Sequence, residues 1–310
     1  MNNRLKRTPV ILLCTLLVVL INGRLFAQQR VQFTQYMFNG LVLNPAYAGG
    51  DEVLSLTLLS RSQWAKVEGA PSTQTLSAHT LLPDKNLGLG VTIINDKIGV
   101  HKDLNAVVSS AYHLKVGRQT SLSMGIQAGI NSRKSDYPSL LGNAGNDPKL
   151  SDVTVSQTFL DLGAGFYLRS PRLHVGLSAP RILPARLTVN DTVAFDLNNI
   201  QYFLLTRYRI SLNQNLALEP GFLLKYLPGV PLSFDINASL IIYEVLTTGF
   251  SYRKNESVDF LLKAQITPRL QLGYAYDHTI GDVRGISPGS NELMVSYQFK
   301  PVHQKIVSPR

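Results

Sequence analysis

The side chains that could carry out chemistry are scattered along this chain. No two of the six histidines have the spacing of a metal-binding helix or a short metal loop: His79, His101, His113, His174, His278 and His303. No Ser/His/Asp order of a known hydrolase can be recognised. Asp277 and His278, with Asp282 nearby, come closest to a catalytic group, but a polar loop explains them better. We therefore expect no enzyme, no metal site and no cofactor site.

The charged residues instead follow the two-residue period of β-strands. In Ser121–Asn131, every second residue from Leu122 to Ile130 is apolar, and the residues between them are polar or glycine. Similar segments recur to the end of the chain, and their apolar face carries no charge. The opposite face carries the charges of these segments: Arg61, Lys115, Asp161, Arg169, Arg207, Arg209, Glu219, Lys225, Asp235, Asp259, Lys263 and Glu292. This segregation fits strands with a lipid-facing side and a polar interior.

Fourteen such segments predict fourteen strands. They are Leu54–Leu58, Leu76–Ala78, Leu87–Ile93, Leu104–Leu114, Leu122–Ile130, Leu160–Leu168, Leu173–Ala179, Tyr202–Ile210, Leu216–Tyr226, Leu232–Leu240, Leu246–Tyr252, Val258–Ile266, Leu270–Tyr276 and Leu293–Phe299. A soluble β-sandwich also alternates, but only 16% of the 310 residues are charged, against about 25% in soluble domains. We predict an all-β fold, a transmembrane antiparallel β-barrel with aromatic residues near the strand ends.

The links between these strands supply a second argument. Long links follow the first, third, fifth, seventh and thirteenth strands, at 63–72, 95–103, 132–156, 180–200 and 277–291. Short links follow the even-numbered strands, as in bacterial barrels with short periplasmic turns and longer extracellular loops. The short links are basic, with Lys85, Lys115, Arg118, Arg169, Arg172, Arg209 and Arg269. An acidic face of a periplasmic protein could bind there, but ordinary solvated turns and anionic lipid headgroups are the simpler explanation of the charges.

The first 27 residues predict a secretory signal, because basic residues precede an apolar stretch, Val10–Ile21, and Ala27 is a small residue at a suitable cleavage point. The single cysteine, Cys14, lies in that stretch, so we expect no disulfide in the exported chain. Beyond it no apolar run is long enough for a transmembrane helix. We divide the chain into a signal peptide (1–27), an N-terminal periplasmic or plug segment (28–50), a barrel (51–299) and a C-terminal tail (300–310).

The segment 28–50 is the candidate plug for a lumen of this size. It carries apolar and aromatic side chains beside polar ones: Phe33, Tyr36, Met37, Phe38 and Tyr47. An ordered leader or a first strand with no gating role is the alternative. The inward charges could form a selectivity constriction, or could neutralise one another. The main candidates are Arg61, Arg207, Arg209, Asp161, Glu219, Asp235 and Lys263.

Several short motifs resemble the PorP/SprF family of type IX secretion system membrane proteins of Bacteroidetes. They are Gln32–Asn39, Asn44–Gly49, Arg61–Trp64, Gly69–Pro71, Thr73–Ser77, Gly88–Gly90, Asn95–Gly99 and Gly289–Glu292. Asn291 stands where a histidine is common in the family. Six residues of these motifs join the candidates for the plug or for partner binding: Asn44, Pro45, Arg61, Trp64, Asn95 and Asp96.

The resemblance implies an outer-membrane barrel that works with the type IX secretion machinery. Its expected partners are periplasmic subunits of that system, an exported surface protein such as a gliding adhesin, and outer-membrane lipid. The alternative is a general outer-membrane channel for small solutes, since other fourteen-stranded barrels with N-terminal plugs move apolar compounds. Nucleic acid is not expected as a partner, because no basic and aromatic cluster occurs.

Overall fold

The computed structural model describes residues 31–83, 85–137, 154–182, 186–187, 193–194 and 200–299. The predicted signal peptide (1–27) and tail (300–310) lie outside the described residues, as do residues 28–30. Within these ranges no helix is long and apolar enough to cross a membrane.

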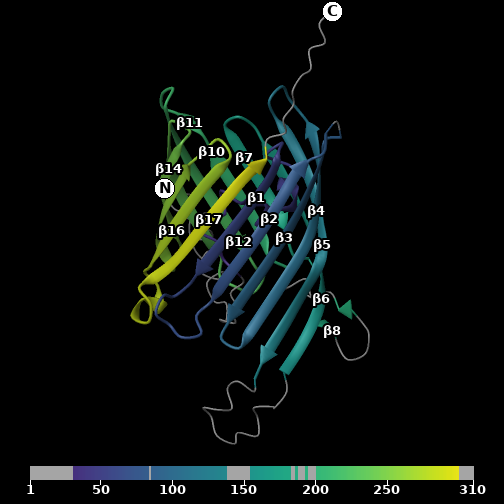
Figure 1. Ribbon diagram of the computed structural model, residues 1–310, viewed down its shortest axis with the longest axis vertical. Coiled ribbons are helices and arrows are strands. Elements are labelled where there is room, and N and C mark those ends of the chain that lie inside the picture. Colours follow the sequence, from purple (N-terminus) through teal and green to yellow (C-terminus); the bar gives the residue numbers. More distant parts are fainter. Residues whose placement is uncertain are drawn as a thin grey trace, which may run out of the picture.

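The described residues form a closed antiparallel β-barrel (Figure 1). Its strands are β1 (Leu54–Ser62), β2 (Ser72–Leu81), β3 (Leu87–Ile98), β4 (His101–Lys115), β5 (Ser121–Asp136), β6 (Thr154–Arg169), β7 (Leu173–Ala179), β10 (Tyr202–Tyr208), β11 (Ile210–Ser211), β12 (Leu216–Tyr226), β13 (Ser233–Ile242), β14 (Leu246–Arg253), β15 (Ser257–Gln265), β16 (Leu270–Thr279) and β17 (Gly289–Phe299). β1 pairs with β17, which closes the ring. β10 and β11 both pair with β12 and form one crossing, so fourteen crossings are described. A separate pair, β8 (Arg186–Leu187) and β9 (Val193–Ala194), lies outside the barrel sheet.

Each predicted strand coincides with one of these crossings, so the predicted fold class is confirmed. The strand ends differ from the prediction in several places. The predicted long link 95–103 is wrong. β3 continues to Ile98 and β4 already begins at His101, so only a two-residue turn joins them. Asp96 pairs with Asp103 and Lys97 with Lys102 across this hairpin, and Gly99 turns at φ +55°. The next long link also shortens, since β5 continues to Asp136 and β6 begins at Thr154. Polar strand residues beyond the apolar band resemble loop sequence, and this caused both errors.

The two ends of the barrel differ. Short turns join β2 to β3, β4 to β5, β6 to β7, β11 to β12, β13 to β14 and β15 to β16, and all lie at the end where β1 begins and β17 finishes. We call this the short-turn end; it is at the top of Figure 1, where the chain leads away from yellow β17. The opposite, long-loop end carries the connections 63–71 and 280–288.

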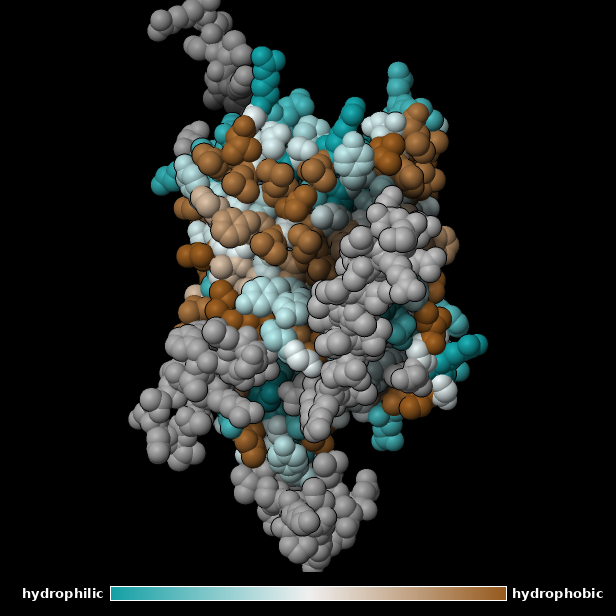
Figure 2. All heavy atoms as spheres, turned by 180° about the vertical axis from the view of Figure 1, so that it is seen from behind, coloured by the Kyte–Doolittle hydropathy of each residue, from teal (hydrophilic) through white to brown (hydrophobic). Residues whose placement is uncertain are grey.

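The outer wall is apolar. Side chains such as Ile126, Val108 and Leu293 are well exposed on it, and Figure 2 shows apolar groups gathered over the wall with hydrophilic groups at its upper rim. Aromatic side chains lie on the outer face near both ends. Tyr202 stacks on Tyr226 near the long-loop end, and Tyr297 packs edge-on against Phe299 near the short-turn end, with centroid separations of 6.2 and 4.7 Å. An exposed apolar band between two aromatic belts is the surface of a membrane-spanning barrel.

Candidate functional site: the plugged lumen

The N-terminal segment Val31–Gly50 lies inside the barrel and forms its core. It contains two short 3-10 turns, η1 (Gly40–Val42) and η2 (Pro45–Tyr47), and no strand. Asn44 caps η2, since its side-chain oxygen accepts from Ala46 N at 2.9 Å and Pro45 occupies the first turn position. Tyr36 and Met37 are buried among side chains that point inward from the strands, including Leu205, Leu223 and Leu261. Apolar contacts therefore fill the middle of the lumen.

A charged cluster holds the start of this segment near the long-loop end. Glu292 on β17 accepts hydrogen bonds from the backbone N–H of Thr34 at 2.9 Å and of Gln35 at 2.8 Å. Arg61 on β1 donates to Glu292 at 3.1 Å, to Asp277 on β16 at 2.6 Å and to Thr34 Oγ1 at 2.8 Å. Because these groups are almost fully buried, each carboxylate needs its cationic and N–H partners to remain charged.

The cluster continues along the neighbouring strands. Arg253, at the end of β14, lies 3.4 Å from Asp235 and 3.6 Å from Asp277, and its guanidinium also donates to Phe33 O at 3.4 Å. Lys225 on β12 pairs with Asp235 at 2.9 Å. Buried Asp259 lies 3.9 Å from Arg253. Charges from seven strands of the wall, β12 to β17 and β1, thus meet around residues 33–35.

Polar contacts also hold the middle of the segment. Arg207 on β10 donates to Met37 O at 3.0 Å and pairs with Glu219 on β12 at 3.2 Å. Asn237 on β13 donates to the Tyr36 hydroxyl at 2.8 Å. The Lys263 ammonium lies over the Phe38 ring, 4.5 Å from its centroid. Three inward charges predicted from the sequence, Arg207, Glu219 and Lys263, therefore contact the segment or each other beside it.

The end of the segment is held near the short-turn end. Asn44 Nδ2 donates to Phe166 O at 2.9 Å, and Ser178 Oγ donates to Leu43 O at 2.6 Å. His113 lies 2.8 Å from Ala48 O, and Gly49 N donates to His79 Nδ1 at 3.2 Å. Arg169 donates to Gly50 O and lies over the Tyr47 ring. The segment therefore runs the length of the lumen from the long-loop end to the short-turn end.

Glycines on the inner wall leave room for the segment. A Cβ added to Gly88 would overlap Ala48 O, one at Gly125 would overlap the Ala46 backbone, and one at Gly165 would overlap the Asn44 side chain. At Gly273 it would overlap the Gln35 side chain. These four inward positions lie on β3, β5, β6 and β16, so the wall is shaped to the backbone that it encloses.

Other candidate residues lie apart from the segment. Trp64, at φ +48°, donates its backbone N–H to Ser290 Oγ at 3.2 Å in the long-loop rim. Asp96 accepts from Thr73 at 2.5 Å on the inner face, whereas Asn95 points outward and donates to Gln74. Asp161 binds Asn105 and Arg181, and Arg209 pairs with Glu244 at the short-turn rim. The structure thus places Asn95 and Arg209 away from the lumen interior.

The potential catalytic residues do not form a catalytic arrangement. Asp277 is buried on the inner face, while the adjacent His278 is exposed on the outer face, because successive strand residues point to opposite sides. The chain does contain a Gly-x-Ser-x-Gly pattern, at residues 285–289. Its serine, Ser287, is buried and donates to the backbone oxygens of Ala65 at 3.1 Å and Gly289 at 3.2 Å. This serine joins two long-loop connections, and no imidazole is hydrogen-bonded to it among the described residues.

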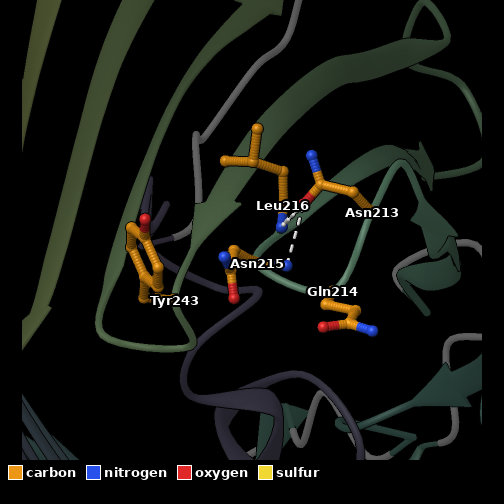
Figure 3. Close-up of a pocket in the computed structure, with 5 residues that line it drawn as sticks. All are labelled: Asn213, Gln214, Asn215, Leu216 and Tyr243. Carbon is orange, nitrogen blue, oxygen red and sulfur yellow. Dashed lines mark hydrogen bonds between the residues drawn. The ribbon is translucent and has the colours of Figure 1, made fainter.

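The described turns of the short-turn rim form hollows, among them the following two. One, of about 510 Å³, lies between the turn after β11 and the turn after β13, and is lined by Asn213–Leu216 and Tyr243. Figure 3 shows Asn213 accepting hydrogen bonds from the backbone N–H groups of Asn215 and Leu216, each 2.8 Å long, with Tyr243 across the hollow. The second, of about 570 Å³, lies between the turns after β4 and β6 and is lined by Arg118 and Arg172 among other turn residues.

Several residues of the site were not named individually as plug or lumen candidates, and Asp277 was considered only as a catalytic residue. Arg253 and Asp277 belong to the charged cluster, and Thr34, Gln35, His79, His113 and Ser178 hold the segment. Extending the predicted strands Leu246–Tyr252 and Leu270–Tyr276 by one residue each places Arg253 and Asp277 on the inner face. The alternation of the sequence could therefore have identified these two residues. The N-terminal segment has no alternation of apolar and polar residues, so the wall residues that contact it could not be predicted from such a pattern.

Comparison with one solved structure, CymD, supports the fold, and two further structures are similar to this chain at lower TM-scores. CymD, a monoaromatic hydrocarbon channel, matches with a TM-score of 0.50 and 13% identity, over 84% of this chain and 92% of that chain. The outer membrane protein Omp33 of Acinetobacter baumannii matches with a TM-score of 0.48 and 10% identity, over 80% of this chain and 98% of that one. A deletion mutant of TodX, another monoaromatic hydrocarbon channel, matches with a TM-score of 0.49 and 11% identity, over 84% and 93%. No curated protein sequence matches this chain.

The apolar band, the aromatic belts and the closed antiparallel sheet define this protein as an outer-membrane β-barrel. In bacterial outer-membrane barrels the short turns face the periplasm. The family described as type IX secretion system membrane protein PorP/SprF matches residues 25–297. The chain belongs to this PorP/SprF family, as its motifs indicated.

Proposed function

We propose that this barrel is a closed docking component of the type IX secretion system, which helps to export or anchor one surface protein. The long-loop end would meet that exported protein, and the short-turn end would meet periplasmic subunits. Family membership supports the association with secretion. The observation that carries the closed, docking role is the N-terminal segment, which fills the lumen and is bonded to the wall at both ends.

In this proposal residues 28–50 act as a plug and the inward charges hold it. Arg61 and Arg207 donate hydrogen bonds to the segment, and Glu219 pairs with Arg207. Asp235 pairs with Lys225 and Arg253, and Arg253 also donates to Phe33 O. An ion passing through the lumen would have to break these contacts. The same arrangement speaks against the alternative role as a channel for small solutes, which requires a continuous path. We further propose that the barrel performs no catalysis, in keeping with the dispersed positions of Asp277, His278 and Ser287.

Crosslinking in the native envelope tests the docking role. The intact protein would be crosslinked in cells, purified under denaturing conditions and analysed by mass spectrometry. We expect peptides of periplasmic type IX subunits joined to the short-turn end, and peptides of an exported surface protein joined to connections 63–71 or 280–288. Recovery of neither class, under conditions where lipid-exposed neighbours are captured, would contradict the proposal.

A further inference from the structure

The second hollow on the short-turn rim, which we call the cationic hollow, differs from the first in carrying two arginines. Its lining residues come from two adjacent turns and are Arg118, Gln119, Thr120, Ser170, Pro171 and Arg172. Both arginines are exposed, and no carboxylate lines the hollow. Among the described residues neither guanidinium has an ion-pair partner, whereas Arg209 farther along the rim pairs with Glu244. Two positive charges therefore face one hollow without neutralisation.

The two turns are closed by their own hydrogen bonds. Val116 N and Gly117 N donate to Thr120 O at 3.0 and 3.1 Å. Leu173 N donates to Ser170 Oγ at 2.9 Å, and Ser170 Oγ donates to Leu173 O at 3.1 Å. The backbone of each turn is thus satisfied internally, and the arginine side chains remain as donors for a ligand.

An apolar strip lies directly beside this hollow on the outer wall. β5 begins at one turn and β6 ends at the other, and Leu122 pairs with Leu168 in the first outward row. Met124 and Phe166 form the next outward row and are well exposed. Two cations therefore lie beside the end of a lipid-facing strip, with Arg118 four residues before Leu122 and Arg172 four residues after Leu168.

We infer that this hollow binds the phosphodiester headgroup of an anionic phospholipid in the periplasmic leaflet, with its acyl chains along the Leu122–Leu168 and Met124–Phe166 rows. A phosphodiester accepts charge-assisted hydrogen bonds from both guanidiniums. Only an amphiphile uses the cations and the adjoining apolar strip together. An acidic peptide or a free phosphate would contact only the two arginines and not the apolar strip. Binding of either one is an alternative outcome of the test.

The structure supplies two matched controls. The other rim hollow has a similar size, about 510 Å³, but none of its lining residues is charged. Lys85 and Arg269 are rim cations on other turns, outside both hollows. Replacing these two removes the same net charge from the short-turn end without changing the cationic hollow.

The test is native mass spectrometry of the full barrel in detergent, titrated with phosphatidylglycerol or phosphatidylcholine. We expect one phosphatidylglycerol to bind preferentially, and the Arg118→Gln/Arg172→Gln variant to weaken its binding about tenfold, or about 1.4 kcal/mol. The Lys85→Gln/Arg269→Gln variant should stay within about twofold of the natural protein. Heat-modifiable migration on gels would verify that each variant is folded.

Three results would overturn the inference. Equal losses in the two double variants would show that only net rim charge matters. Equal binding of phosphatidylglycerol and phosphatidylcholine, with no effect of the arginines, would show an unspecific lipid shell. Displacement of the bound lipid by polyglutamate or by inorganic phosphate at concentrations matching the lipid would assign the hollow to a peptide or to a free anion.

Discussion

Arg61 shows how one buried side chain connects distant parts of this chain. It lies on β1, and it bonds Thr34 in the N-terminal segment, Asp277 on β16 and Glu292 on β17. Its side chain is 2% exposed and that of Glu292 is 0% exposed. Since a buried charge without its partner is strongly destabilising, Arg61 is the residue whose loss should affect the plug most.

Replacement of Arg61 by alanine should lower the free energy of unfolding by about 3–5 kcal/mol, because buried Glu292 loses its cation and buried Asp277 keeps only the more distant Arg253. Denaturant unfolding of the barrel in detergent would measure this. The control is Arg133→Ala, which removes a bidentate but exposed pair with Asp103 and should cost below about 1 kcal/mol. A similar, small loss in both variants would show that the cluster is not a clamp.

Gly125 tests the fit between wall and plug. A methyl group at this position would overlap the backbone of Ala46 in η2, so Gly125→Ala should destabilise the barrel by about 1–3 kcal/mol through overpacking. Gly285→Ala is the control, because nothing lies within 4 Å of its added Cβ. Thermal unfolding would compare the two, and an unchanged melting temperature for Gly125→Ala would mean that η2 does not occupy this place.

At the scale of elements, the outward face of each strand should tolerate charge only outside the membrane. Ile126 in β5 is 67% exposed and Ile286 in the long-loop connection is 69% exposed. Ile126→Arg should cost about 2–4 kcal/mol, because it places a cation against lipid, whereas Ile286→Arg should have little effect. Folding into lipid vesicles, followed by gel mobility, measures both. Equal tolerance at the two positions would contradict a lipid-facing wall.

The strands could be predicted from the sequence because burial in lipid on one side imposes a period of two. The period fixed the position of each crossing, as for Leu122–Ile130 within β5. It did not fix the ends, since the outward residues of β3 and β4 turn polar beyond the apolar band while the ladder continues to Ile98. Where both faces of a strand are polar, the sequence shows no alternation, and the end of the strand cannot be predicted from it.

The candidate site was only partly predictable. Aromatic residues such as Phe33 and Tyr36 identified the segment as a plug candidate, and both are buried in the lumen. Its irregular backbone gives no register, so the bonds of Thr34 and Gln35 to Glu292 could not be deduced. The inward glycines Gly88, Gly125 and Gly165 make room for residues 44–48. Those residues lie far from them in the sequence, so the sequence does not show what the glycines accommodate.

At the scale of the whole molecule, the barrel and its plug form one closed unit. The segment begins near the long-loop end, passes Arg207 and finishes beside His113 at the short-turn end, where β1 begins. Both ends of the barrel therefore remain free to meet other molecules while the lumen stays filled. A closed barrel of this kind suits a membrane anchor for partners on both sides.

Planar-bilayer conductance of the purified, intact barrel tests this closure most directly. We predict no steady conductance for the intact protein, and open-channel currents when residues 28–50 are deleted from a barrel that still shows heat-modifiable folding. Steady conductance of the intact protein, selective for one solute, would contradict the closed docking barrel and favour a channel.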